Sequence, residues 1–203
     1  MVRDEELRGA LGSIPAVAID GPWLRAVDTR LLLPGPAGSP EGTTLGPLWG
    51  GGARLHGARY TPPGSFDTLY LASDLETLGA EIGVVAGASH RVSPSKDPFT
   101  VVHVRGRLTH VLDLRDPAVR DALATTREEL AAPWRFEPSP PTQRLGDATH
   151  ESKRFVALVA PSARGRGRAR GFVLAVFTER LGQFPPSFLQ AVDASGALRR
   201  RLP

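Results

Sequence analysis

Arginine, tyrosine and glutamate recur at even intervals in the first half of the chain, and together they suit nucleotide chemistry. Tyr70 follows Arg59 by 11 residues, and Glu81 follows Tyr70 by another 11. An arginine can hold a phosphate through two parallel hydrogen bonds, and a tyrosine ring can stack on a base or on nicotinamide. A glutamate can stabilise the oxocarbenium-like transition state that forms when a glycosidic bond breaks. The set predicts metal-free cleavage of an N-glycosidic bond.

These side chains need two strands to bring them together. The residue types of 55–60 and 68–72 predict two short strands, joined by a turn at Pro62-Pro63-Gly64. Arg59 then stands near the end of the first strand and Tyr70 lies within the second. The two side chains are therefore expected on neighbouring parts of one sheet.

Glu81 is expected on a helix that follows directly. Ser73 or Asp74 would cap this helix, which carries apolar residues at helical spacing: Leu75, Leu78, Ile82 and Val85. Glu81 stands beside that apolar stripe, where an unpaired carboxylate would be costly to bury. From the pattern alone, the alternative is a glutamate at the solvent-exposed edge of the helix.

The rest of the chain is a mixture of short strands and short helices. Further helices are expected at 4–11, 116–123, 126–131 and 142–153. Further strands are expected at 23–27, 99–104, 108–114, 155–160 and 171–177, with 99–104 and 108–114 paired around Arg105-Gly106-Arg107. The segment 34–52, dense in Gly, Pro, Ser and Thr, is expected to be a long surface loop. Strands and helices do not alternate strictly, so the pattern favours an α+β domain.

Composition excludes several classes of protein. The 203 residues include no cysteine, which excludes a disulfide scaffold, thiolate zinc sites and a cysteine nucleophile. The five histidines show no metal-ligand spacing, and there is no phosphate-binding loop or nucleophile elbow. No signal peptide and no membrane-spanning stretch are visible, so a soluble cytoplasmic protein without a metal is expected.

The charge balance is a weak indicator of nucleic-acid binding. The net charge is +4, and all but two of the 25 basic residues are arginine. Because arginine does not deprotonate in practice, a small excess of it raises the isoelectric point strongly. We therefore do not expect nucleic-acid binding to be the main function.

Six short elements in a fixed order resemble the RES-domain family, the toxins of RES–Xre toxin–antitoxin systems. The resemblance runs from about Trp23 to Leu181. The elements are Gly57-Ala58-Arg59-Tyr60, Leu69-Tyr70-Leu71-Ala72, Leu78-Gly79-Ala80-Glu81, Val111-Leu112-Asp113-Leu114 with Asp116-Pro117-Ala118-Val119, Thr142-Gln143-Arg144-Leu145-Gly146, and Ala160-Pro161-Ser162-Ala163. The resemblance implies a RES domain at 23–182, with an N-terminal helical extension at 1–22 and a C-terminal tail at 183–203.

The resemblance also implies a fold, an activity and partners. The fold would be ADP-ribosyltransferase-like, a mixed α/β body with a split central β-sheet and an NAD-binding cleft. A bacterial toxin of this family would consume NAD as its substrate, by phosphorolysis, hydrolysis or ADP-ribosyl transfer. An antitoxin with an Xre-type helix-turn-helix domain would neutralise it, and a homodimer is a further family-based expectation.

By the same resemblance, each site residue has an implied role. Glu81 would be the catalytic carboxylate, and Arg59 would bind the phosphates of NAD. Tyr70, with Tyr60 beside Arg59, would line the nicotinamide-ribose pocket, and Ser162 would hydrogen-bond in the site. An earlier first-strand arginine is best matched by Arg25, with Arg30 as the competitor.

Two features depart from the family pattern. The loop between Arg25 and Arg59 looks long, and Arg170-Gly171 stands where family members usually carry an asparagine. An arginine-rich loop, 164–170, precedes that position. This loop supports the alternative function, a non-catalytic RES-like protein that binds nucleic acid or an acidic partner.

Overall fold

The computed structural model describes residues 4–32, 46–82, 98–135, 137–164, 171–192 and 199–203. Its strands are β1 (Val17–Asp20), β2 (Trp23–Asp28), β3 (Thr68–Ala72), β4 (Phe99–Asp113), β5 (Ala157–Pro161), β6 (Phe172–Phe177), β7 (Phe188–Val192) and β8 (Arg199–Leu202). Its α-helices are α1 (Asp4–Ser13), α2 (Gly51–His56), α3 (Leu75–Ile82), α4 (Pro117–Ala122), α5 (Arg127–Ala131) and α6 (Pro141–Glu151). Two short 3₁₀ helices span Thr29–Leu31 and Thr178–Gln183. No helix in this described part is long and apolar enough to cross a membrane.

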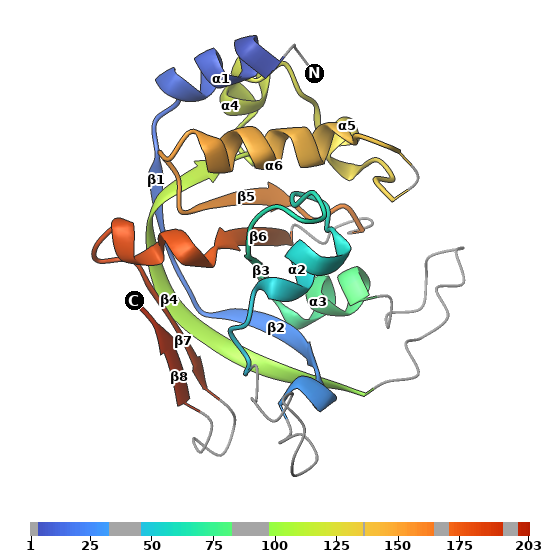
Figure 1. Ribbon diagram of the computed structural model, residues 1–203, viewed down its shortest axis with the longest axis vertical. Coiled ribbons are helices and arrows are strands. Elements are labelled where there is room, and N and C mark those ends of the chain that lie inside the picture. Colours follow the sequence, from blue (N-terminus) through green and yellow to red (C-terminus); the bar gives the residue numbers. More distant parts are fainter. Residues whose placement is uncertain (1–3, 33–45, 83–97, 136, 165–170, 193–198) are drawn as a thin grey trace.

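The strands form one mixed and strongly curved sheet (Figure 1). Its order is β2-β3-β6-β5-β4-β7-β8, and β1 pairs with β4. The β4–β5 pair is parallel, whereas the other pairs are antiparallel. Because β2 pairs with both β3 and β4, the five strands β2, β3, β6, β5 and β4 close into a ring.

The ring is split between β2 and β3. β2 forms six residue pairs with β4, from Trp23↔Val104 to Asp28↔Phe99. Its pairing with β3 is limited to Leu24↔Ala72. After Leu24 the two strands therefore separate, and the backbone leaves a gap in the sheet that other parts of the chain must fill.

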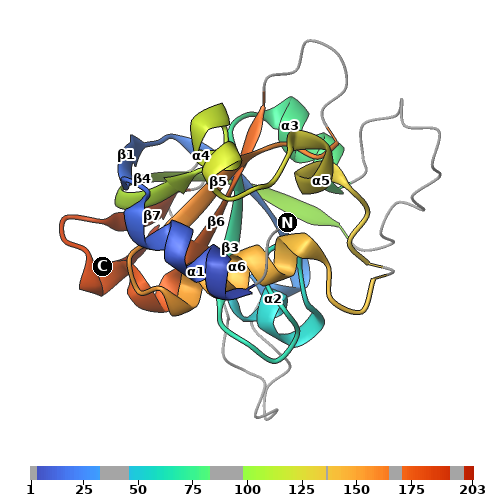
Figure 2. The ribbon, with the colours of Figure 1, turned by 90° about the horizontal axis from the view of Figure 1, so that it is seen from above.

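Two apolar cores pack on the two faces of this curved sheet. The core inside the ring collects alternate side chains from its strands, among them Trp23, Leu69, Val104, Val159 and Leu174. The second core lies between the outer face of the sheet and the helices, and includes Leu7, Leu112, Leu123, Leu145 and Phe177. Figure 2 shows α1 beside α6 over this outer face, where Arg8 pairs with Glu151 at 2.8 Å and Arg144 with Asp4 at 2.6 Å. The mixed α/β architecture with a split sheet is the expected fold class.

The expected strand at 55–60 is wrong. Residues Gly51–His56 form helix α2, and Gly57 follows with a φ of +70°. Beyond it, only a bridge between Ala58 and Thr61 remains in place of a strand. The glycine at positive φ ends the helix and reverses the chain, a conformation that other residues rarely adopt.

The expected strand pair around Arg105-Gly106-Arg107 is also wrong, because 99–113 is one continuous strand. Gly106 is not a turn residue. A side chain there would collide with the Phe188 carbonyl oxygen at 2.4 Å, so the glycine allows β7 to approach β4 closely.

The other expected helices and strands agree with the structure to within a few residues, but three strands were not expected: β1, β7 and β8. Most of the expected loop at 34–52 lies outside the described residues, and its last two residues begin α2. β1 joins the sheet from the N-terminal side, and β7 and β8 extend it from the C-terminal side. The boundaries at 22/23 and 182/183 stay a prediction. Segments on both sides of them contribute strands to the same sheet.

Candidate functional site

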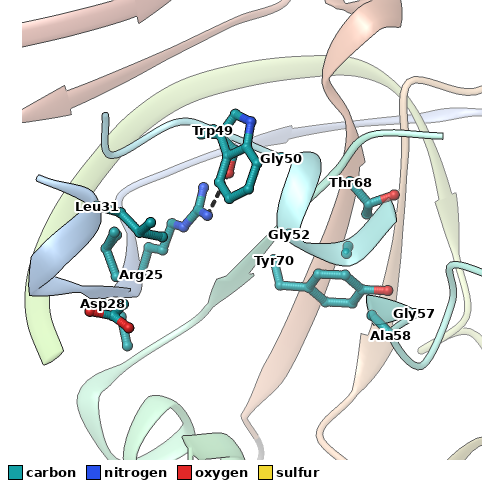
Figure 3. Close-up of a pocket in the computed structure, with 13 residues that line it drawn as sticks. Arg25, Asp28, Leu31, Trp49, Gly50, Gly52, Gly57, Ala58, Thr68 and Tyr70 are labelled. Atoms are coloured by element: carbon teal, nitrogen blue, oxygen red, sulfur yellow. Dashed lines mark hydrogen bonds between the residues drawn. The ribbon is translucent and has the colours of Figure 1, made fainter. Parts of the chain in front are cut away.

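A cavity of about 310 Å³ lies in the gap between β2 and β3. One wall is the second half of β2, and another comes from Thr68 and Tyr70 of β3. The segment around Trp49 and the start of α2 closes the space between them, as Figure 3 shows. A volume of this size is at the lower end of the range for small-molecule sites, roughly 300–1,000 Å³.

Arg25 is the cationic residue that lines this cavity. Its Nη2 donates to the Trp49 carbonyl oxygen at 2.7 Å, whereas its buried Nη1 has no hydrogen-bond partner among the described residues. Burial lowers the pKa of the guanidinium to about 10, so it stays charged at neutral pH. A buried cation with an unused donor is costly unless a ligand supplies an acceptor.

Arg30 differs from Arg25 in both position and pairing. It lies on the 3₁₀ helix after β2, is well exposed, and forms an ion pair with Asp28 at 2.6 Å. The cavity is lined by Arg25 and Asp28 but not by Arg30. Of the two competing arginines, Arg25 therefore has the geometry of a ligand-binding residue.

A second buried polar atom in the cavity wall lacks a partner. Thr68 is 2% exposed, and its Oγ1 makes no hydrogen bond in the described structure. Its backbone N–H donates to the Gly50 carbonyl oxygen at 3.2 Å, which ties β3 to the start of α2. Two residues of the cavity wall thus carry a polar atom that is buried from the cavity and lacks a partner, one cationic and one hydroxyl. An anionic ligand would satisfy them once the wall shifts to expose them.

Tyr70 links the cavity to the turn that follows α2. Its hydroxyl oxygen accepts from the backbone N–H of Tyr60 at 2.9 Å and lies 3.0 Å from Oγ1 of Thr61. Burial is the main cause that raises the pKa of Tyr70 to about 12, so the phenol is neutral. Figure 3 shows its ring in the cavity wall with the hydroxyl toward Gly57 and Ala58.

Helix α6 holds this turn from behind. Nε2 of Gln143 donates to the carbonyl oxygens of Ala58 at 2.9 Å and Thr61 at 3.3 Å. A side chain at Gly146 would lie 1.9 Å from the Tyr60 carbonyl oxygen, so only glycine permits this approach. The helix therefore fixes the backbone that carries Arg59 and Tyr60.

Arg59 is used in a structural contact. Its Nη1 donates to the carbonyl oxygens of Leu130 and Ala132, both at 2.8 Å. These are carbonyls at the C-terminal end of α5, which a cation stabilises. Arg59 does not line the cavity. Its expected contact with phosphate stays a prediction.

Glu81 and Ser162 form a direct hydrogen bond. The Ser162 hydroxyl donates to Oε1 of Glu81 at 2.7 Å, and Ser162 is 7% exposed. Ser162 and the segment just before α3 are both hydrogen-bonded to the chain where β6 begins. Ser162 N–H donates to the Gly171 carbonyl oxygen at 3.0 Å, and Ser73, before α3, exchanges two hydrogen bonds with Phe172.

The start of α3 is fixed by its cap, which sets where Glu81 lies one helix length later. Oδ1 of Asp74 accepts from the backbone N–H of Thr77 at 2.8 Å, as the expected capping position requires. Thr77 is buried against Gly171, where a side chain would lie 1.7 Å from its Oγ1. The carboxylate of Glu81 is therefore a positioned group and not a free surface glutamate.

The charge of Glu81 influences the pKa of the Tyr60 hydroxyl. Tyr60 is fully buried, and burial is the main cause that raises the pKa of its hydroxyl above the usual range. The Glu81 carboxylate adds to this rise, and the Arg59 guanidinium opposes it. Arg59 and Glu81 therefore lie close enough to the Tyr60 hydroxyl to influence it, although none of these three residues lines the cavity.

The structure thus groups the predicted residues in two contiguous sets. Arg25 and Tyr70 line the cavity, and Glu81 and Ser162 are paired beside Tyr60. Sequence reasoning assigned no site role to Trp49 or Thr68, and it named Gln143 only as part of the resemblance, without a role. An aromatic residue directly before Gly50-Gly51-Gly52 was a usable signal for a close-packed backbone at Trp49.

Two further expectations concern the arginine-rich loop and a metal site. Most of the arginine-rich loop, 165–170, lies outside the described residues, and so does the position expected to carry asparagine, Arg170. No group of three or more metal-ligating side chains occurs among the residues that the structure describes.

Comparisons with known proteins agree with the fold. A search of curated protein sequences finds no match. The structure is similar to a chain in the crystal structure of the M. tuberculosis MbcT–MbcA toxin–antitoxin complex. The TM-score is 0.63 at 21% identity, over 93% of this chain and 90% of that chain. The sequence model of the RES-domain family matches residues 36–195, which is most of the sequence. The chain therefore belongs to the RES-domain family.

Proposed function

We propose that this chain is the toxin of a toxin–antitoxin pair and that it consumes NAD by breaking the bond between nicotinamide and ribose. The observation that carries the proposal is the hydrogen bond from the Ser162 hydroxyl to the Glu81 carboxylate, within a chain of the RES-domain family. Membership of that family, together with a fold neighbour taken from a toxin–antitoxin complex, supports the biological role.

Glu81 would stabilise the transition state. As the C–N bond breaks, positive charge develops on the ribose, and a carboxylate held nearby lowers the energy of that charge. The leaving nicotinamide takes the bonding electron pair and departs as a neutral molecule, so it needs no proton from the protein. Ser162 fixes one carboxylate oxygen and leaves the other oxygen for the substrate.

The cavity would bind the nucleotide. Arg25 would turn its unused, buried N–H donor toward a phosphate, and Tyr70 would present its ring to the nicotinamide ribose. Tyr60 shapes the same pocket through its hydrogen bond to the Tyr70 hydroxyl. Arg59 acts here mainly by holding α5 against the turn at 58–61.

The partner would be an antitoxin with an Xre-type helix-turn-helix domain, and the toxin would act in the bacterial cytoplasm, where NAD is found. The acceptor of the ADP-ribosyl group is water, phosphate or a protein side chain. All three acceptors share the same NAD site, and each gives a different product mass.

One incubation tests the proposal. Purified protein is mixed with NAD, with and without inorganic phosphate, and the products are resolved by mass. We expect free nicotinamide in stoichiometric yield with loss of NAD. A phosphorylated ADP-ribose, plain ADP-ribose or a modified protein would then identify the acceptor. NAD that stays intact under both conditions would overturn the proposed activity.

A further inference from the structure

Trp49 forms the wall of the cavity next to Arg25. Its side chain is partly exposed, although it belongs to a segment whose neighbours, Leu48 and Gly50, are buried. Figure 3 shows the indole beside the Arg25 guanidinium, with Tyr70 further along the cavity. A partly exposed aromatic ring in a cavity wall beside a buried cation is suited to stacking on a planar ligand.

Two observations describe how Trp49 is placed, one for its backbone and one for its ring. The Trp49 carbonyl oxygen accepts from Nη2 of Arg25 at 2.7 Å, so the backbone of Trp49 is tied to the same guanidinium that has an unused donor. The indole lies over Gly51, where a Cβ atom would stand 2.6 Å from the ring atoms Cε2 and Cζ2. The ring therefore occupies space that a side chain at residue 51 would take.

We infer that Trp49 is the stacking platform for a ring of the nucleotide, while Arg25 binds the phosphate attached to the same nucleoside. This inference rests on the proposed function, because it takes NAD as the ligand. Stacking of a base on an aromatic side chain contributes substantially to binding and tolerates different bases. The shared chemistry is a planar ring on a ribose phosphate, which both the adenine half and the nicotinamide half of NAD provide.

Titration calorimetry with AMP and with nicotinamide mononucleotide tests the inference and separates the two halves. The protein is compared with its Trp49→Leu and Trp49→Phe variants. We expect Trp49→Leu to weaken binding of one of the two mononucleotides by roughly 5- to 150-fold, the range for one stacked base. Trp49→Phe, which keeps an aromatic face, is expected to restore most of that affinity.

Two glycine variants act as a matched pair. Gly51→Ala places a Cβ atom against the indole and is expected to weaken the same mononucleotide, although Trp49 itself is unchanged. Gly9→Ala, in α1 and away from the cavity, meets nothing within 4 Å and should bind like the original protein. Thermal unfolding of every variant identifies any that fail to fold, and the Phe variant tests the inference if Gly51→Ala does.

The outcomes separate this inference from the proposed function. If neither mononucleotide nor NAD binds the unaltered protein, the proposed function fails and the inference fails with it. If the unaltered protein binds a mononucleotide and Trp49→Leu binds it equally well, only the stacking role is overturned. Binding lost in both the Leu and Phe variants, despite normal folding, would also overturn stacking, since an aromatic face would then not be the determinant.

Discussion

The cavity between β2 and β3 and the turn at 58–61 under α6 are neighbours whose arginines are partnered differently, although the Tyr60 hydroxyl of the turn is, like two polar atoms of the cavity wall, buried without a partner. In the cavity wall, Nη1 of Arg25 and Oγ1 of Thr68 are buried without partners. In the turn, Gln143 satisfies the carbonyls of Ala58 and Thr61, and Arg59 is bound to two carbonyls near the end of α5.

The difference separates ligand-binding groups from scaffold. A buried polar group without a partner destabilises the protein unless something else binds it, whereas a satisfied group contributes to stability whether or not a ligand is present. Arg25 and Arg59 are therefore not equivalent arginines. Changes in the cavity should alter binding and catalysis. Changes in the contacts of the turn at 58–61 with α5 and α6 should lower the stability of the fold first.

The largest expected effect comes from Glu81→Gln. The exchange is nearly isosteric but removes the negative charge opposite the forming cation, and losing such a group typically costs on the order of 100- to 1,000-fold in rate. Turnover at saturating NAD should fall by that factor with an unchanged melting temperature. Glu76→Gln, on the exposed first turn of the same helix, is the control. If Glu81→Gln turned over NAD at the wild-type rate, Glu81 would not be the catalytic carboxylate.

The next effect distinguishes the two arginines. Arg25→Lys loses the second nitrogen that a phosphate would meet, and a hydrogen bond to a charged group contributes about 1.5–3 kcal/mol. We expect KM for NAD to rise roughly 10- to 100-fold by that estimate, whereas Arg59→Lys should change KM less and lower the stability more. Steady-state kinetics and urea unfolding of both variants measure this. A larger rise of KM in Arg59→Lys would reverse the assignment and support direct phosphate binding by Arg59.

A smaller effect, on the free energy of unfolding, tests the contact between α6 and the turn at 58–61. In Gly146→Ala the new Cβ atom would lie 1.9 Å from the Tyr60 carbonyl oxygen, so α6 or the turn must move. Overpacking of this kind costs about 1–3 kcal/mol of unfolding free energy. Gly12→Ala in α1, which meets nothing within 4 Å, is the matched control and should not destabilise. Equal unfolding free energies for the two variants would show that α6 does not hold the turn.

The smallest effect concerns acid stability at His150, outside both regions. Its Nε2 lies 2.6 Å from Glu179, its ring stacks on Phe66, and burial is the main cause that lowers its pKa. The unfolded chain therefore binds a proton more readily, and stability should fall as the pH drops through about 6.5, the ordinary histidine value. His150→Gln should lose less stability between pH 7.5 and 5 in urea unfolding. A larger loss of stability in His150→Gln would show that protonation of His150 stabilises the folded protein, opposite to this prediction.

Local rules were sufficient for part of this fold. Asp74 caps α3 and Asp116 caps α4 as their positions predict, because a cap depends on residues two or three positions away. Gly106 was misjudged as a turn because its role depends on β7, more than 80 residues later in the chain. Residues 55–60 were misjudged because α2 packs into a gap that only the complete sheet creates.

In the candidate site, too, residue types could be predicted from the sequence, whereas contacts between distant segments could not. Residue type and order were enough to single out Tyr70, Glu81 and Ser162 as candidates, and the Glu81–Ser162 contact brings two of them together. Spacing could not reveal that Arg59 is bound to α5 while Arg25 keeps an unused donor, because those contacts join segments far apart in the sequence. Trp49 was missed for the same reason, since its neighbour Arg25 is 24 residues away.

A crystal structure of the Glu81→Gln variant with NAD tests the central claim most directly, because this variant should bind the dinucleotide without consuming it. We predict a phosphate oxygen within hydrogen-bond distance of Nη1 of Arg25, and the nicotinamide ribose beside residue 81 and Ser162. NAD bound through Arg59 with an empty β2–β3 cavity, or bound elsewhere on the protein, would contradict the account.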